Sequence, residues 1–215
     1  MKLPSPVISI EIVSLTAAIV LLTRDKNSFW KIVMLYIAIA LFFESYGSYL
    51  NSKKINNLWW FNMFIFLEAG FILYGLYHCL RKYINPLNII VAGTIIVYGS
   101  YGLSVILNGY KQYNILCVNV MSVLFTVYAL YYYYLLLRDE HFIVLKSHPE
   151  FWWVTGVLFY YFGSTMANIF DGMFNFKVLN WLPLRYLIYI VLNLILHSLW
   201  IYSFICRMKQ RKLQS

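Results

Sequence analysis

The chain of 215 residues is 62% hydrophobic and 12% charged, with 20 Tyr, 16 Phe and 7 Trp. A soluble domain of this size could not cover so much apolar surface, so the composition excludes a soluble fold and makes lipid the expected solvent. The net charge of +9 does not indicate nucleic-acid binding, because the basic residues stand singly or in pairs beside apolar runs. We therefore expect a single membrane domain over residues 1–215 and no nucleic-acid partner.

Apolar stretches long enough to cross a bilayer follow one another along nearly the whole chain. Continuous rather than alternating hydrophobicity favours helices, whose backbone groups are satisfied within each segment. The predicted fold class is all-α, a polytopic bundle of seven transmembrane helices. These helices are expected near residues 5–23, 28–50, 58–80, 86–107, 113–137, 151–172 and 183–206. The first run precedes LLTRDK without a small-residue cleavage motif, so we expect it to be retained.

The loops carry the residues that begin helices. Asn85-Pro86 precedes the fourth helix, and the segment from Ser147 to Glu150 has the spacing of a capping box before the sixth. The connection over residues 138–150 also holds two histidines and three acidic residues. Helix capping and interfacial anchoring account for these residues, so we predict no metal site there.

The basic residues predict the orientation. With strict alternation of sides, one side carries 11 of the 17 basic residues and the other carries six. The positive-inside rule then places the N-terminus outside and the C-terminus in the cytoplasm. Cys79 and Cys206 fall at cytoplasmic helix ends and Cys117 near an outer end, so no extracellular disulfide is expected. The C-terminal tail is expected to lie against anionic headgroups.

A faint internal repeat relates two parts of the chain. The first helix ends in LLTRDK and the fifth in LLLRDE, and the following helices carry FFESYGS and YYFGS. This plan of three, one and three helices resembles the sugar-exporter, PQ-loop and opsin-like proteins. The chain lacks a Pro-Gln pair and lacks a retinal-binding lysine between Pro183 and Arg207, which excludes a rhodopsin-type photoreceptor. The stretch FWWVTGVLFYYFGS resembles small bacterial seven-helix membrane proteins of unassigned function, which implies a bacterial inner membrane and no particular chemistry.

Three glutamates inside predicted spans are the clearest functional signal. Glu11 and Glu44 lie about 9 Å from the outer helix ends, and Glu68 lies near the midplane. Each ionisable group in a spanning helix costs roughly 2.5 to 3.5 kcal/mol on insertion, so such groups usually face the bundle interior and mark a functional site. We predict that these glutamates line an acidic cavity that opens outward.

Polar residues on the last two helices recur at helical spacing and are expected to face the same cavity. Tyr98, Tyr101 and Ser104 on the fourth helix and Asn62 and Tyr74 on the third extend this candidate pocket. The alternative is that such groups only join neighbouring helices through hydrogen bonds. Arg185 either pairs with Asp171 or faces headgroups. The predicted ligand-binding residues are Glu11, Glu44, Glu68, Asn168, Asp171, Asn193 and His197.

The leading functional hypothesis is a receptor or sensor that binds a small extracytoplasmic ligand or a proton in this cavity. Because apolar runs occupy nearly all of the sequence, it would signal through a separate cytoplasmic partner. The alternative is a transporter of small solutes or protons, whose carboxylates would hold a coupling ion near the midplane. An intramembrane lipid-modifying enzyme is disfavoured, because no nucleophile motif, metal-ligand spacing or phosphate-binding loop is present. No cofactor is expected.

Overall fold

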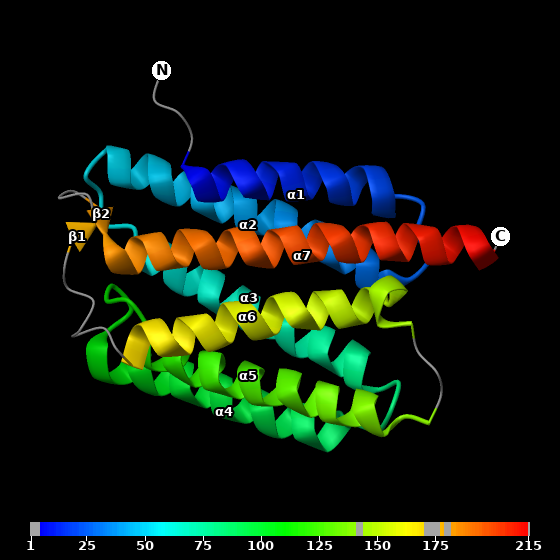
Figure 1. Ribbon diagram of the computed structural model, residues 1–215. Coiled ribbons are helices and arrows are strands. Elements are labelled where there is room, and N and C mark those ends of the chain that lie inside the picture. Colours follow the sequence, from blue (N-terminus) through cyan, green and yellow to red (C-terminus); the bar gives the residue numbers. More distant parts are fainter. Residues whose placement is uncertain (1–4, 141–143, 170–176, 179–181, 215) are drawn as a thin grey trace.

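The computed structural model describes residues 5–140, 144–169, 177–178 and 182–214. Within them the chain is helical except for its loops and a pair of two-residue strands (Figure 1). The antiparallel strands pair Lys177 with Pro183 and Val178 with Leu182. The elements are α1 (Pro6–Leu22), α2 (Ser28–Ser52), α3 (Leu58–Leu80), α4 (Leu87–Asn108), α5 (Ile115–Arg138), the 3₁₀ turn η1 (Leu145–Ser147), α6 (Pro149–Ile169), β1 (Lys177–Val178), β2 (Leu182–Pro183) and α7 (Leu184–Gln214).

Five of these helices are long and apolar enough to cross a bilayer, namely α2, α3, α4, α5 and α7. Such helices satisfy their own backbone hydrogen bonds in hydrocarbon, so the protein is an integral membrane protein of the all-α class. Helix α1 has 17 residues and is shorter than this class of span. A full set of seven membrane spans therefore remains a prediction, as does the internal repeat.

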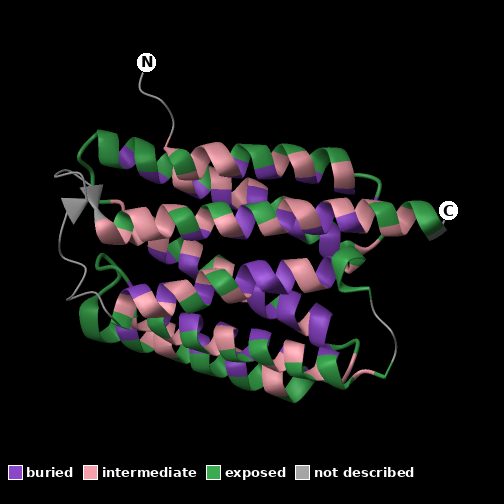
Figure 2. Cartoon of the chain, viewed as in Figure 1, coloured by how far each residue is buried: buried purple, intermediate pink, exposed green. Residues whose placement is uncertain are grey.

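The helices run back and forth between two ends of an elongated bundle (Figure 1). We call one the hairpin end, where β1 and β2 lie, and the other the C-terminal end, where α7 finishes. Helix α3 contacts α2, α4, α5 and α6, and it is the most deeply buried of the five candidate spans. Helix α4 is the least buried and lies at the edge of the bundle (Figure 2).

Large aromatic side chains fill the bundle between its centre and the C-terminal end. Trp153 of α6 and Trp200 of α7 stack with ring centroids 5.9 Å apart, and the Trp200 indole N–H donates to the Trp153 carbonyl. A Cβ atom at Gly75 would overlap the Trp153 ring, so a glycine is required where α3 passes this indole. We call Phe29, Phe71, Trp153 and Trp200 the aromatic layer. All four are buried.

Two helix ends differ from their expected form. Helix α6 begins at Pro149, and His148 Nδ1 accepts the Phe151 N–H, while the Ser147 hydroxyl turns back to the Val144 carbonyl. The proposed Ser147 capping box is therefore not formed, because the proline fixes the first helical position one residue later than the box requires. Helix α7 also continues to Gln214, beyond the expected end near residue 206.

Candidate functional site

A small polar chamber lies between α3, α5, α6 and α7, with Glu68 as the carboxylate that lines it. Tyr161 of α6 donates its hydroxyl to Glu68 Oε1 at 2.7 Å, which links two helices across the interior. The chamber has a volume of about 50 Å³. It is lined by Ile65, Glu68, Tyr113, Val118, Met121, Ser122, Tyr160, Tyr161, Ser164 and Tyr189. Its polar lining atoms are thus mainly hydroxyl and carboxylate oxygens.

A hydrogen-bond network connects the chamber to the hairpin end. The hydroxyls of Ser164 and Tyr189 lie 3.2 Å apart, and Tyr189 donates to Asn168 Oδ1 at 3.0 Å. Asn168 donates to Asn119 Oδ1 at 2.7 Å and accepts from Arg185 Nη2 at 3.0 Å. Asn168 therefore joins α5, α6 and α7 just beyond the chamber.

Glu11 and Glu44 stand next to this chamber without lining it. Electrostatic interactions link Glu44 to Glu11 and to Glu68, and all three act on the Tyr36 hydroxyl. Glu11 is 3% exposed, and its Oε2 atom has no hydrogen-bond partner within the described part of the chain. The three predicted glutamates thus form one electrostatic group, with Glu68 nearest the cavity.

The other predicted ligand residues have different positions. Asn193 donates to the Tyr189 carbonyl one turn earlier on α7, which is a bond within its own helix. His197 is buried against Trp200, with ring centroids 5.8 Å apart, and does not line the chamber. Asp171 lies outside the described residues, and so does its suggested pairing with Arg185. Arg185 is seen to bind Asn168.

Three polar residues of α3 and α4 bond to backbone atoms and do not line the chamber, namely Asn62, Tyr98 and Tyr101. Asn62 is fully buried and donates to the carbonyls of Tyr110 and Gln112, while its Oδ1 accepts from the Asn114 N–H. Tyr101 donates to the Asn62 carbonyl. Likewise, Tyr98 donates to the Phe66 carbonyl. Because all these partners are backbone atoms, this part of the candidate pocket fastens the α4–α5 loop to α3.

The aromatic layer separates the chamber from the C-terminal end. Tyr36 stacks on Phe71 with centroids 3.8 Å apart and ring planes 4° apart. Phe71 in turn meets the edges of Trp153 and Trp200 at 6.1 and 6.0 Å. These contacts leave the chamber enclosed on this side by close-packed rings.

Beyond the aromatic layer, Glu150 is the centre of an ionic cluster that we call the Glu150 cluster. Glu150 is 2% exposed, and its Oε1 lies 2.6 Å from Lys82 Nζ at the end of α3. His148 and His78 nitrogens lie 3.6 and 3.9 Å from the same carboxyl group. His78 also stacks on Phe29 of the aromatic layer at 4.2 Å. Glu150 therefore ties the start of α6 to the end of α3.

Asp25, between α1 and α2, forms a second ionic contact at this end. Arg207 Nε and Nη2 donate to its two carboxylate oxygens at 2.7 and 3.0 Å, and Arg211 Nη1 lies 3.9 Å away. Burial raises the pKa of Asp25, but the hydrogen bonds and charge of Arg207, the Asn27 N–H and the charge of Arg211 outweigh it. The pKa therefore lies below its ordinary value, and Asp25 is ionised at neutral pH. This pair fixes α7 to the α1–α2 loop.

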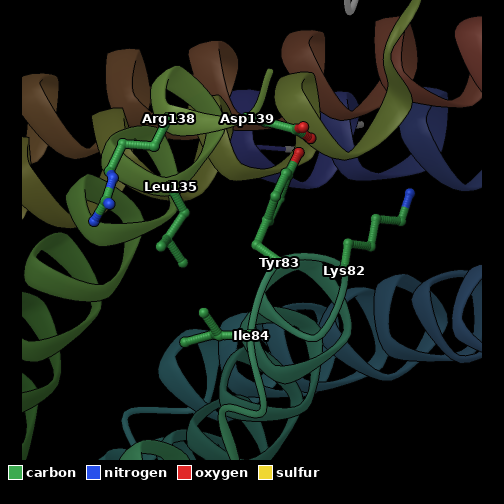
Figure 3. A pocket seen from close by; sticks show the side chains of 6 residues that line it. All are labelled: Lys82, Tyr83, Ile84, Leu135, Arg138 and Asp139. Carbon is green, nitrogen blue, oxygen red and sulfur yellow. The ribbon is translucent and has the colours of Figure 1, made fainter. Parts of the chain in front are cut away.

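A larger cavity of about 400 Å³ opens at the C-terminal end between the α3–α4 turn and the last turn of α5. Figure 3 shows Lys82 and Arg138 pointing away on opposite sides of it, with the Tyr83 hydroxyl directed toward Asp139. Lys82 is engaged by Glu150, and Arg138 donates to the Tyr134 hydroxyl at 3.1 Å. Because its charged groups diverge, this cavity is a weaker candidate site than the chamber.

The described residues contain no group of three or more His, Cys, Asp or Glu side chains that could hold a metal ion. The three cysteines are free and buried. Residues that sequence reasoning did not single out are Tyr161 and Tyr36 beside the carboxylates, and Asp25 with Arg207. Tyr161 lies one turn before Ser164, which in turn lies one turn before Asn168, and this helical spacing is the signal that could have identified Tyr161.

Searches of protein-family models, curated proteins and solved structures find no match to this chain.

Proposed function

We propose that the protein is a membrane sensor that binds a small extracytoplasmic ligand in the chamber around Glu68 and signals through a separate cytoplasmic partner. In this proposal the hairpin end faces outside and the C-terminal end faces the cytoplasm of a bacterial cell. The excess of basic residues near the C-terminal end supports this orientation.

The observation that carries the proposal is the hydrogen bond from Tyr161 to Glu68 in the wall of the chamber. Glu68 is half-buried within α3. An ionisable carboxylate inside a membrane-spanning helix is costly, and such residues mark binding sites or ion pathways. The bond crosses from α3 to α6, so any ligand that alters the charge of Glu68 also alters the contact between two helices.

Helix α6 offers a route from the chamber to the cytoplasmic end. It contacts α3 through Tyr161 and Glu68 at one level and through Glu150 and Lys82 at the other. A shift of α6 against α3 at the chamber would therefore disturb the buried Glu150 cluster. A partner protein could read this change at the exposed loops nearby.

A transporter is the second candidate, and the electrostatic grouping of Glu11, Glu44 and Glu68 favours it. Transport also requires a polar path to the other side. The stacked Trp153 and Trp200 rings occupy that position, which supports sensing over transport.

The test follows the separation of α3 and α6 with spin labels on cysteines introduced at Arg81 and Ser147, both of which are exposed. The protein is reconstituted in lipid vesicles, and acid, Na⁺ and tetramethylammonium are applied in turn to the hairpin side. We expect at least one of these probes to change the separation in the wild-type background and to have no effect after Glu68→Gln. The exposed Glu140→Gln is the matched control and should respond as wild type.

If none of the three probes moves the labels in the wild-type background, the sensor proposal is wrong. A probe-driven flux across the vesicle membrane that Glu68→Gln abolishes would establish the transporter instead.

A further inference from the structure

We infer that the ligand of the chamber is the proton, bound by Glu68 and exchanged with the hairpin side through the hydroxyls of Ser164 and Tyr189. This inference rests on the proposed sensor function and names the ligand of that site. It draws on the size of the chamber, the groups that face Glu68 and the polar route outward.

The size of the chamber excludes organic ligands in this conformation. Its volume of about 50 Å³ holds a few water molecules. Sites for drug-sized organic ligands occupy roughly 300 to 1,000 Å³. The lining ring of Tyr161 is buried and that of Tyr160 is half-buried, so the space beside Glu68 admits water and small ions only.

The groups around Glu68 are acids and hydroxyls. Among the described residues, the charged side chain that acts on Glu68 is another acid, Glu44. Glu11 joins this group through Glu44 and Tyr36. Arg185 binds Asn168 and acts on Tyr113. The titratable groups around Glu68 come from four neighbouring elements. They are Tyr36 and Glu44 on α2, Tyr113 before α5, Cys117 on α5, Tyr160 and Tyr161 on α6, and Tyr189 on α7.

These surroundings favour the protonated, neutral form of Glu68 over the ionised carboxylate. An ion inside a bundle needs a partner of opposite charge or several hydrogen bonds, and within the described ranges Glu68 has one hydrogen bond and an acidic neighbour. The buried Glu11 Oε2, which has no hydrogen-bond partner in the described region, shows the same shortage of counter-charges nearby. This group of carboxylates is therefore neutralised by binding protons.

Polar groups lead from the chamber toward the hairpin side. Ser164 lines the chamber, its hydroxyl lies 3.2 Å from that of Tyr189, and Tyr189 donates to Asn168 Oδ1. A hydroxyl can accept one proton and release another, so Ser164 and Tyr189 can relay protons between chamber water and the surface. Asn168 also contacts the exposed Asn119 at the mouth of this route.

Proton binding changes one helix contact directly. The proton forms an O–H bond to Glu68 Oε2, and the carboxylate becomes a neutral acid. Tyr161 keeps its hydroxyl proton, but its bond to Oε1 changes from charge-assisted to neutral, which is roughly half as strong. Acid on the hairpin side therefore loosens the α3–α6 contact, and alkali tightens it.

The test is infrared difference spectroscopy of the full-length protein in lipid vesicles, scanned over roughly pH 4 to 9. We expect a carboxylic-acid C=O band that appears with acid and is absent in Glu68→Gln. Tyr161→Phe keeps the carboxyl group and should shift the frequency of this band, because the band's hydrogen-bond donor is lost. Glu140→Gln removes an exposed carboxyl outside the bundle and should leave the band unchanged.

A band that is independent of pH, or that survives in Glu68→Gln, overturns the proton inference. So does a label movement driven by Na⁺ at constant pH, which would identify a metal cation as the ligand while leaving the sensor proposal intact. A titrating Glu68 band without any movement of the Arg81 and Ser147 labels would give the opposite result: the proton site would stand and the sensor proposal would fail.

Discussion

The carboxylates at the two levels of the bundle have opposite surroundings. Asp25 and Glu150, near the C-terminal end, each lie against a cation at 2.7 Å or less. Glu68, on the other side of the aromatic layer, is held by a tyrosine hydroxyl and faces a second acid. An acid with a counter-charge fixes structure, whereas one inside a span without a counter-charge is the acid that we propose to respond to a ligand. The presence or absence of a counter-charge, and not burial alone, is therefore what distinguishes the candidate functional carboxylate.

The largest loss of stability is expected at a carboxylate that has a counter-charge. Asp25→Asn leaves Arg207 and Arg211 without their carboxylate and should lower the free energy of unfolding by about 3 kcal/mol. The pKa of Asp25 is depressed, so its contribution is present above its unfolded value of about 3.9 and is lost as pH falls through the folded value. Thermal unfolding in detergent between about pH 3 and 7 measures both effects. A variant as stable as wild type at pH 7 would show that the pair is not structural.

Asn62 fastens the hairpin end with neutral hydrogen bonds, so its role should not depend on pH. Asn62→Ala removes three contacts with the 109–114 loop and should cost about 2 to 3 kcal/mol. Asn51→Ala, at an exposed position of α2, is the control and should be nearly neutral. Equal losses in the two variants would argue against a fastening role for Asn62.

The aromatic layer between the two levels can be disturbed by one methyl group. Gly75→Ala places a Cβ atom against the Trp153 ring and should cost about 2 kcal/mol by overpacking. Gly99→Ala, at a helical position with no heavy atom within 4 Å, should stabilise the protein by up to about 1 kcal/mol. The comparison of melting temperatures tests the packing. Similar changes in both variants would mean that the layer is loosely packed.

The smallest effect is expected at the unpaired carboxylate. Gln at position 68 still accepts the Tyr161 hydroxyl and carries no charge, so Glu68→Gln should change the free energy of unfolding by about 1 kcal/mol or less. Stability measured at pH 7 is the readout. A loss as large as that of Asp25→Asn would place Glu68 among the structural carboxylates and contradict the contrast drawn above.

The sequence was sufficient to predict the helical class and the membrane location, because hydropathy and insertion cost are local properties of each segment. It was not sufficient for the partners of the polar residues. Asn62 looked like a cavity residue, yet its bonds go to a loop some 50 positions later in the chain. Tyr161 and Glu68 are 93 residues apart, so only the packing of α3 on α6 reveals their contact.

The proposed sensor requires that the chamber and the Glu150 cluster are coupled through α6. A double-mutant cycle measures this coupling directly, from the free energies of unfolding of Glu68→Gln, Glu150→Gln and the double variant. We predict that the double variant departs from the sum of the single effects by more than about 0.5 kcal/mol, although the two residues do not touch. Additive effects within that margin would show that the two levels are independent and would contradict the account.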